Sequence, residues 1–140
     1  MSNSKVAIIT EQRAGCVMPL GLLASAIVLQ GTFAVVDTSG YGIDSQAVGG
    51  ADQICLGVYA ESVENTGADG EAIVMVERKK QFLVSNSSTD PVSQADLGIK
   101  VYVEDNQTIA KTSNNGSLSL AGTFMGFDSQ YKNYVWVEIN

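Results

Sequence analysis

The clearest structural signal in the chain is the stretch Glu71-Ala72-Ile73-Val74-Met75-Val76-Glu77-Arg78. Side chains of a β-strand point alternately to opposite faces, so a period of two in hydrophobicity indicates a strand. The alternation divides the stretch into two faces, with Ala72, Val74 and Val76 on one and Ile73, Met75 and Glu77 on the other. The stretch therefore predicts a β-strand.

Similar short runs follow along the whole chain, which contains 16 Val and 9 Ile residues. Clusters of Gly, Asn, Asp and Ser separate the runs, and these residues favour tight turns. The other predicted strands are Lys5–Thr10, Ala26–Leu29, Thr32–Asp37, Gln53–Ala60, Gln81–Val84, Lys100–Glu104, Thr108–Lys111, Leu118–Phe127 and Tyr134–Ile139. Strands at this spacing predict an all-β fold, either a single-domain β-sandwich or a partly closed β-barrel.

Two local motifs refine this prediction. Asn114-Asn115-Gly116 predicts a hairpin turn, because type I′ turns need residues that tolerate positive φ. A short helix is predicted at about residues 90–97, because Thr89 or Asp90 can cap it, Pro91 suits its first position and Gly98 suits its end.

Composition limits the possible functions. The 140 residues suffice for one domain, and 45% hydrophobic with 16% charged residues exclude intrinsic disorder. A net charge of −7 argues against binding to a nucleic-acid backbone. The chain has no histidine, and Cys16 and Cys55 lie in no zinc-binding motif, so neither a metal site nor a cofactor is predicted. Both cysteines have apolar neighbours, and we expect buried free thiols.

Catalysis would have to depend on Asp and Glu, because no motif of a nucleophilic or nucleotide-binding enzyme is present. Most of the acidic residues fall in predicted turns, where carboxylates accept backbone hydrogen bonds. We therefore predict no catalytic residues.

Residues 1–24 are predicted to form an N-terminal arm, and residues 25–140 a single β domain. The apolar run from Gly15 to Leu29 resembles part of a secretion signal, but Pro19 and Gly21 interrupt it and it is too short to span a bilayer. No membrane partner is predicted. An uncovered apolar segment would mark an interface, so the arm either folds back on the domain or extends onto a neighbouring subunit. The candidate contact residues in it are Val17, Met18, Leu20, Leu22 and Leu23.

Two further groups are candidate contact residues. Arg78-Lys79-Lys80 is the only basic run, and forms either a charged hairpin turn before Gln81–Val84 or a patch for an acidic partner. In Tyr134–Ile139 the alternation assigns Val135, Val137 and Ile139 to the core. Tyr134 and Trp136 then either form a binding surface or pack against another layer.

Four stretches together resemble the small capsid decoration, or capsid cement, proteins of tailed bacteriophages. The first runs from Gln30 to Tyr41 and includes Gly31-Thr32-Phe33 and Gly40-Tyr41; the second runs from Leu56 through the Gly-rich loop Asn65–Gly70. The third is Ala95–Val103 with Asp105 and Thr108, and the last is Leu120–Thr123 with Asp128 and Val135-Trp136-Val137-Glu138-Ile139. The resemblance extends over about residues 14–139.

This resemblance implies a protein without a catalytic site or cofactor. Such proteins are made in the bacterial cytoplasm and then bind the outer surface of the expanded capsid, commonly as trimers. They bridge copies of the major capsid protein and stabilise the shell against the pressure of the packaged DNA. Two alternatives remain: another β-rich virion component, such as a head-fibre base or tail element, and a small-ligand-binding sandwich or carboxylate-dependent hydrolase.

Overall fold

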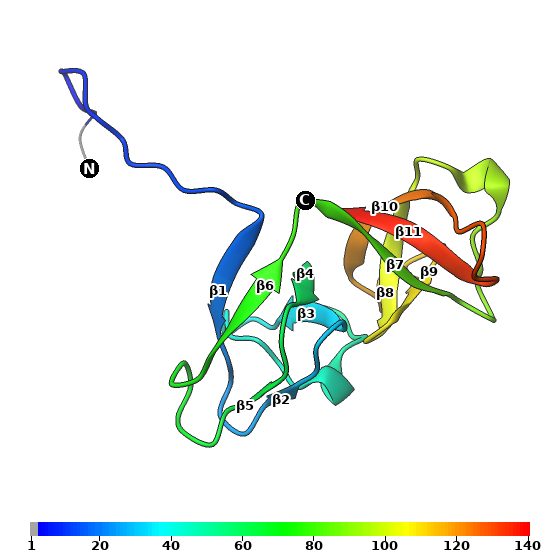
Figure 1. Cartoon of the computed structure of the whole chain (residues 1–140), viewed down its shortest axis with the longest axis horizontal. Coiled ribbons are helices and arrows are strands. Elements are labelled where there is room, and N and C mark those ends of the chain that lie inside the picture. Colours follow the sequence, from blue (N-terminus) through cyan, green and yellow to red (C-terminus); the bar gives the residue numbers. More distant parts are fainter. Residues whose placement is uncertain (1–2) are drawn as a thin grey trace.

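The computed structural model describes residues 3–140 and shows an all-β protein (Figure 1). The predicted all-β fold class is confirmed. Of the two predicted architectures, a sandwich or a partly closed barrel, the structure contains a barrel, and this barrel is fully closed. Within the described residues there are no α-helices, and two 3₁₀ turns, Ser45–Ala47 and Gln94–Asp96, accompany the strands. The strands are β1 Val17–Gly21, β2 Ile27–Val28, β3 Phe33–Val36, β4 Ile54–Tyr59, β5 Val63–Glu64, β6 Ile73–Glu77, β7 Lys80–Asn86, β8 Lys100–Asp105, β9 Thr108–Ala110, β10 Leu120–Phe127 and β11 Tyr134–Ile139.

The first half of the chain forms a four-stranded antiparallel sheet in the order β1-β6-β4-β3. As the alternation predicts, Val74 and Val76 of β6 are fully buried, whereas Ile73 and Met75 are exposed. The two valines pack in a core that includes Leu22, Val28 and Tyr59. The short pair β2-β5 contributes Val28 to this core.

The second half forms a closed barrel in the order β10-β11-β7-β9-β8. Val135, Val137 and Ile139 of β11 are buried inside it, as predicted. Residues of the sheet join this core, because Phe33 and Val58 belong to the same cluster of contacting side chains. The sheet and the barrel therefore share apolar packing.

The predicted arm, residues 1–24, extends too far into the chain, because the structure ends it at residue 14. Residues 17–21 form β1, which pairs with β6 from Val17 opposite Glu77 to Gly21 opposite Ile73. Leu20 and Leu22 are buried in the core of the sheet. The segment lacked a recognisable strand pattern because Pro19 and Gly21 interrupt it, yet an edge strand tolerates proline when its nitrogen faces away from the sheet.

The hydrogen bonds show that Pro19 occupies such a position. Arg78 N donates to Cys16 O and Leu22 N donates to Ala72 O, so the even-numbered residues of this segment bond to β6. Val17 and Pro19 direct their backbone polar groups to the open edge of the sheet, whereas at Gly21 the edge is covered, because Gly21 O accepts a bond from Gly42 N.

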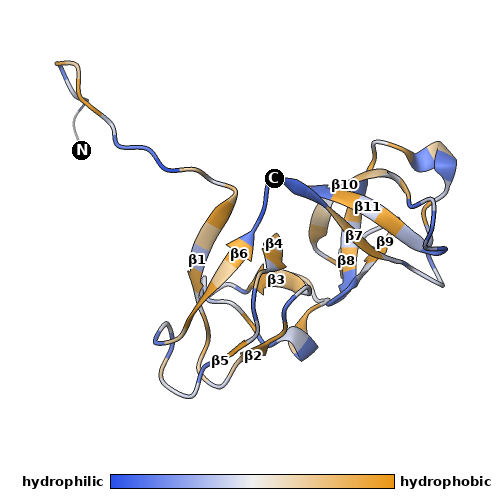
Figure 2. Ribbon diagram, in the orientation of Figure 1, coloured by the Kyte–Doolittle hydropathy of each residue, from blue (hydrophilic) through white to orange (hydrophobic). Residues whose placement is uncertain are grey.

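The predicted strand Lys5–Thr10 is also absent. Residues 3–14 are exposed and carry no strand, and they extend away from the rest of the protein (Figures 1 and 2). A single extended segment without a partner cannot complete a hydrogen-bond ladder, which explains why its β-branched residues do not form a strand here.

The basic run is not a hairpin turn. β6 pairs with β1 and β4, whereas β7 pairs with β11 and β9, so residues 78–80 carry the chain from the sheet to the barrel. Lys79 adopts a positive φ of 60°, and its N–H donates to Ile139 O at 2.6 Å. We call Arg78, Lys79 and Lys80 the crossover.

Asn114-Asn115-Gly116 also forms a turn without a hairpin. All three residues have positive φ, as the motif requires. The flanking strands β9 and β10 do not pair with each other, because β8 lies between them in the barrel.

The predicted helix at about 90–97 is wrong in length and type, because only the 3₁₀ turn Gln94–Asp96 forms there. Its first residues are held elsewhere: Val92 N donates to Asn86 Oδ1, and Asn86 Nδ2 donates to Val92 O. The Asp96 carboxylate accepts bonds from the N–H and hydroxyl of Ser93. These two bonds hold the pKa of the Asp96 carboxyl below its ordinary value, and the bond from the Ser93 N–H has the larger effect. The Lys111 ammonium, 3.5 Å from the carboxylate, lowers the pKa further.

We predict that Asp96→Asn reduces the free energy of unfolding at about pH 7 but not at about pH 2. A carboxylate with a lowered folded pKa stabilises the fold above its unfolded pKa of about 3.9, and this contribution is lost as the pH falls through the folded value. Urea denaturation of both proteins at the two pH values measures the difference. An equal difference at both values would contradict the assignment.

We predict that Leu22→Ala lowers the free energy of unfolding by about 2–5 kcal/mol, because it removes a fully buried side chain. Ile73→Ala is the matched control, since Ile73 is 58% exposed, and it should cost less than about 1 kcal/mol. Chemical denaturation measures both. A small loss for Leu22 would show that residues 17–22 do not belong to the sheet.

Candidate interaction surface

The N-terminal arm, now residues 3–14, exposes large apolar side chains. Val6, Ile8 and Ile9 are 74%, 69% and 98% exposed. Hydrophilic residues from Thr10 to Arg13 separate this apolar tip from the sheet (Figure 2). Exposed aliphatic groups gain free energy when another surface covers them, so the tip is suited to contact a second molecule.

The root of the arm lies beside the crossover. Cys16 and Arg78 are a hydrogen-bonded pair at the end of the β1-β6 ladder, and Arg78 Nη1 lies 3.7 Å from the Met18 sulfur. The Lys79 ammonium lies against Gly15, where an added Cβ would be 2.5 Å from Nζ. The arm therefore leaves the domain between two cationic side chains.

An uncovered apolar strip lies on the opposite face of the same two strands. Pro19 is opposite Met75 and Gly21 is opposite Ile73, so these residues share a face. Val17, Ile73 and Met75 are exposed on it. Together, the arm, the crossover and this strip form the candidate interaction surface.

The structure brings together only some of the predicted contact residues. Val17, Met18, Arg78, Lys79 and Lys80 gather at the root, where Val17 and the lysines are exposed and Met18 and Arg78 are half-buried. Leu20 and Leu22 are buried in the core of the sheet, so the prediction that they are contact residues is wrong. Leu23 is half-buried and packs against both cores.

Tyr134 and Trp136 lie elsewhere. Tyr134 is exposed at the start of β11 and stacks edge-to-face with Tyr131 at 6.3 Å, while Trp136 is half-buried. At the other end of β11, Ile139 pairs with Lys80 and accepts a hydrogen bond from the Lys79 N–H, so that end of the strand contacts the crossover. Five residues of strand, about 17 Å, therefore separate Tyr134 from the candidate surface.

Sequence reasoning missed Ile73, Met75 and Pro19 as surface residues. The alternation in β6 already placed Ile73 and Met75 on one face, but only the exposure of both side chains in the folded protein shows that they are uncovered. Nothing in the sequence indicated that Pro19 is exposed, because the face on which Pro19 lies depends on how β1 is aligned with β6.

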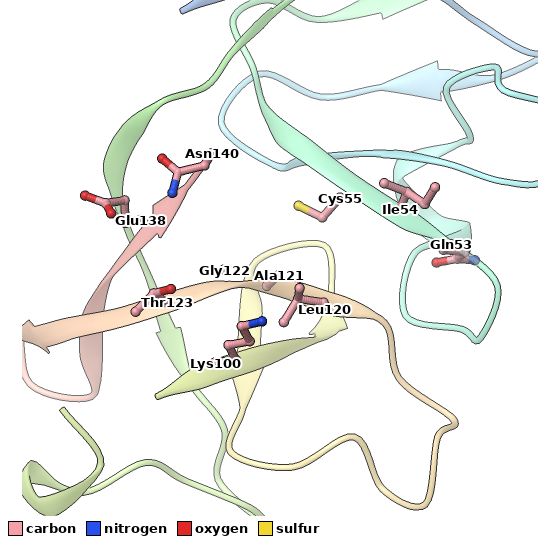
Figure 3. Close-up of a pocket in the computed structure, with 10 residues that line it drawn as sticks. All are labelled: Gln53, Ile54, Cys55, Lys100, Leu120, Ala121, Gly122, Thr123, Glu138 and Asn140. Atoms are coloured by element: carbon pink, nitrogen blue, oxygen red, sulfur yellow. The ribbon is translucent and has the colours of Figure 1, made fainter. Parts of the chain in front are cut away.

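A pocket of about 390 Å³ lies between β4 and the barrel strands (Figure 3). Its walls include Ile54, Cys55, Leu120 and Ala121, with Lys100 and Glu138 on β8 and β11. Thr123 pairs with both Lys100 and Glu138 across the strands. Glu138 is the one carboxylate among the lining residues, so this pocket lacks the two acids that a hydrolase needs.

Two carboxylates, Asp90 and Glu104, line a second pocket of about 380 Å³. Asp90 accepts bonds from the N–H and hydroxyl of Thr112, and Glu104 accepts a 2.6 Å bond from the Ser87 hydroxyl. These bonds tie the segment that contains Ser87 and Asp90 to strand β8 and to Thr112, which is a structural role. Among residues 3–140 no group of three or more His, Cys, Asp or Glu side chains is placed to hold a metal ion, and no helix is long and apolar enough to cross a membrane.

The two cysteines are free, but only one is shielded. Cys16 is exposed at the root of the arm, so its prediction as a buried thiol is wrong. Cys55 is half-buried, and burial raises the pKa of its thiol to about 12. The thiolate is the reactive form, so Cys55 is chemically inert at neutral pH.

Comparison with protein-family models, curated proteins and solved structures finds no match for this chain.

We predict that a thiol-alkylating reagent at about pH 8 modifies Cys16 and leaves Cys55 unmodified in the folded protein. A pKa raised from 9.0 to about 12 lowers the thiolate population of Cys55 about a thousandfold. Mass spectrometry of the digested protein measures the two sites. Both should react in urea, and fast modification of Cys55 without denaturant would contradict its shielding.

Proposed function

We propose that this protein is a non-enzymatic structural component of a tailed-bacteriophage virion, and that it binds the outer surface of the mature, expanded capsid. The observation that carries the proposal is the N-terminal arm, whose Val6, Ile8 and Ile9 are left exposed by residues 3–140. The resemblance of the sequence to capsid decoration proteins supplies the partner, the major capsid protein.

In this proposal the arm and its root bind the shell while the β domain acts as a rigid body. The arm is suited to this role because it leaves the sheet at a fixed point, the β1-β6 ladder, and its apolar tip lies several residues beyond. An arm that becomes ordered on binding loses conformational entropy, so its affinity alone is modest.

Repetition would provide the stability. Each copy that bridges two capsid subunits adds a second contact at high effective concentration, and self-association, as a trimer, adds further contacts. A ligand that binds the closed shell and not the opened one stabilises the closed shell, which would counteract the pressure of packaged DNA.

Co-sedimentation of the purified protein with expanded and unexpanded capsids of its own phage tests the proposal. We expect saturable binding, at hundreds of copies, to the expanded shell only. Replacing Val6, Ile8 and Ile9 by Ser should weaken that binding at least about tenfold, because about 2 kcal/mol is lost for each covered aliphatic side chain.

The control replaces Leu97, Met125 and Tyr131 by Ser, because these large apolar residues are also exposed but lie on the barrel half. The control should bind like the wild type. Absence of wild-type binding to either shell would contradict the proposal, and a few copies per intact virion would instead indicate a tail or fibre component.

A further inference from the structure

The positive charges of this acidic protein are concentrated at the arm and the crossover. Five of the eight basic residues lie there, namely Lys5, Arg13, Arg78, Lys79 and Lys80. Glu11 lies in the arm and Glu77 directly precedes the crossover, so the arm, the crossover and Glu77 together carry a net charge of +3. Because the whole chain has a net charge of −7, the remaining residues together carry a net charge of −10.

Arg78 has no partner for its charge within the described residues. The ion pairs there are Lys80 with Glu77 at 3.8 Å and Lys111 with Asp96 at 3.5 Å. The Arg78 Nε is buried and makes no hydrogen bond, and the contact of Nη1 with the Met18 sulfur is a weak one. Because Nε is shielded, a carboxylate from another molecule can reach this guanidinium only at its Nη groups, which form no ion pair within the described residues.

The surroundings of Arg78 would strengthen such a bond. Met18 and the β1-β6 ladder shield one side of the guanidinium, and the Lys79 ammonium stands nearby at Gly15. A carboxylate that approaches this site meets two cations in partly desolvated surroundings, where charge-assisted hydrogen bonds are stronger than in water.

We propose that Arg78 and Lys79 form the anchor for carboxylate groups of the capsid surface on which the arm docks. This inference rests on the proposed function and adds the chemistry of the partner: the shell is acidic at this contact, with apolar groups beside the acids for the arm tip. Charge complementarity argues for it, because the basic end is the end from which the arm emerges.

Binding of variants to expanded capsids, measured at about 0.05 M and about 0.5 M NaCl, tests the anchor. Arg78→Gln and Lys79→Gln should each raise the Kd about tenfold or more at low salt, and both should show a weaker salt dependence than the wild type. Arg78→Lys should recover little, because lysine cannot reproduce the bidentate geometry of a guanidinium. Lys132→Gln, which removes an exposed charge from the β10-β11 turn, should bind like the wild type.

The outcomes separate the two proposals. Wild-type binding that is unaffected by salt and by both Gln variants overturns the anchor and leaves the proposed function intact, whereas no wild-type binding overturns both. Lys79 is exposed, so its variant should remain folded by circular dichroism even if the Arg78 variant does not. Self-association without capsids that depends on Arg78, seen by analytical ultracentrifugation, would overturn the anchor by assigning its carboxylates to a second copy of this chain.

Discussion

The backbone ladder between β1 and β6 is the constraint on which the rest of the structure depends. It aligns Leu20 with Val74 and Met18 with Val76, and so closes the core of the sheet. Its last bond, from Arg78 N to Cys16 O, fixes the point at which the arm leaves the domain. The same register places the guanidinium of Arg78 over Met18. Stability of the sheet and presentation of the arm therefore have one cause.

The crossover connects this ladder to the barrel. Lys79 reaches its positive φ at a cost that its hydrogen bond to Ile139 offsets, and that bond joins the last strand of the barrel to the end of the sheet. Phe33 and Val58 extend the barrel core into the sheet. A load on the arm is thus transmitted to both halves of the molecule through backbone bonds and apolar packing.

Local patterns predicted the strands whose faces differ in polarity, and they failed where neighbours distant in sequence decide the outcome. The alternation in β6 and β11 identified Val74, Val76, Val135 and Val137 as core residues. The pattern of β1 was unreadable, because Pro19 and Gly21 acquire a meaning only beside β6. For the same reason the sequence of the crossover suggested a hairpin turn. Turn-forming residues indicate where the chain changes direction, but they do not determine which strands pair with each other.

The candidate surface shows the same division. The basic run and the apolar arm were visible in the sequence, whereas the contact of Arg78 Nη1 with Met18, which lies 60 residues away along the chain, is seen only in the folded protein. Leu20 and Leu22 are candidate contact residues in the sequence, which leaves open whether they fold back on the domain, because hydrophobicity alone does not distinguish an interface from a core.

Pro19 has a consequence for behaviour at high concentration. The open edge of β1 is the kind of surface on which strands of other molecules add, and repeated addition leads to aggregation. At the midpoint of this edge the outward-facing residue has no N–H, so an incoming strand would find a carbonyl group and no donor. The gap in the ladder lowers the gain from edge-to-edge pairing. Many copies can therefore crowd together without polymerising through their sheets.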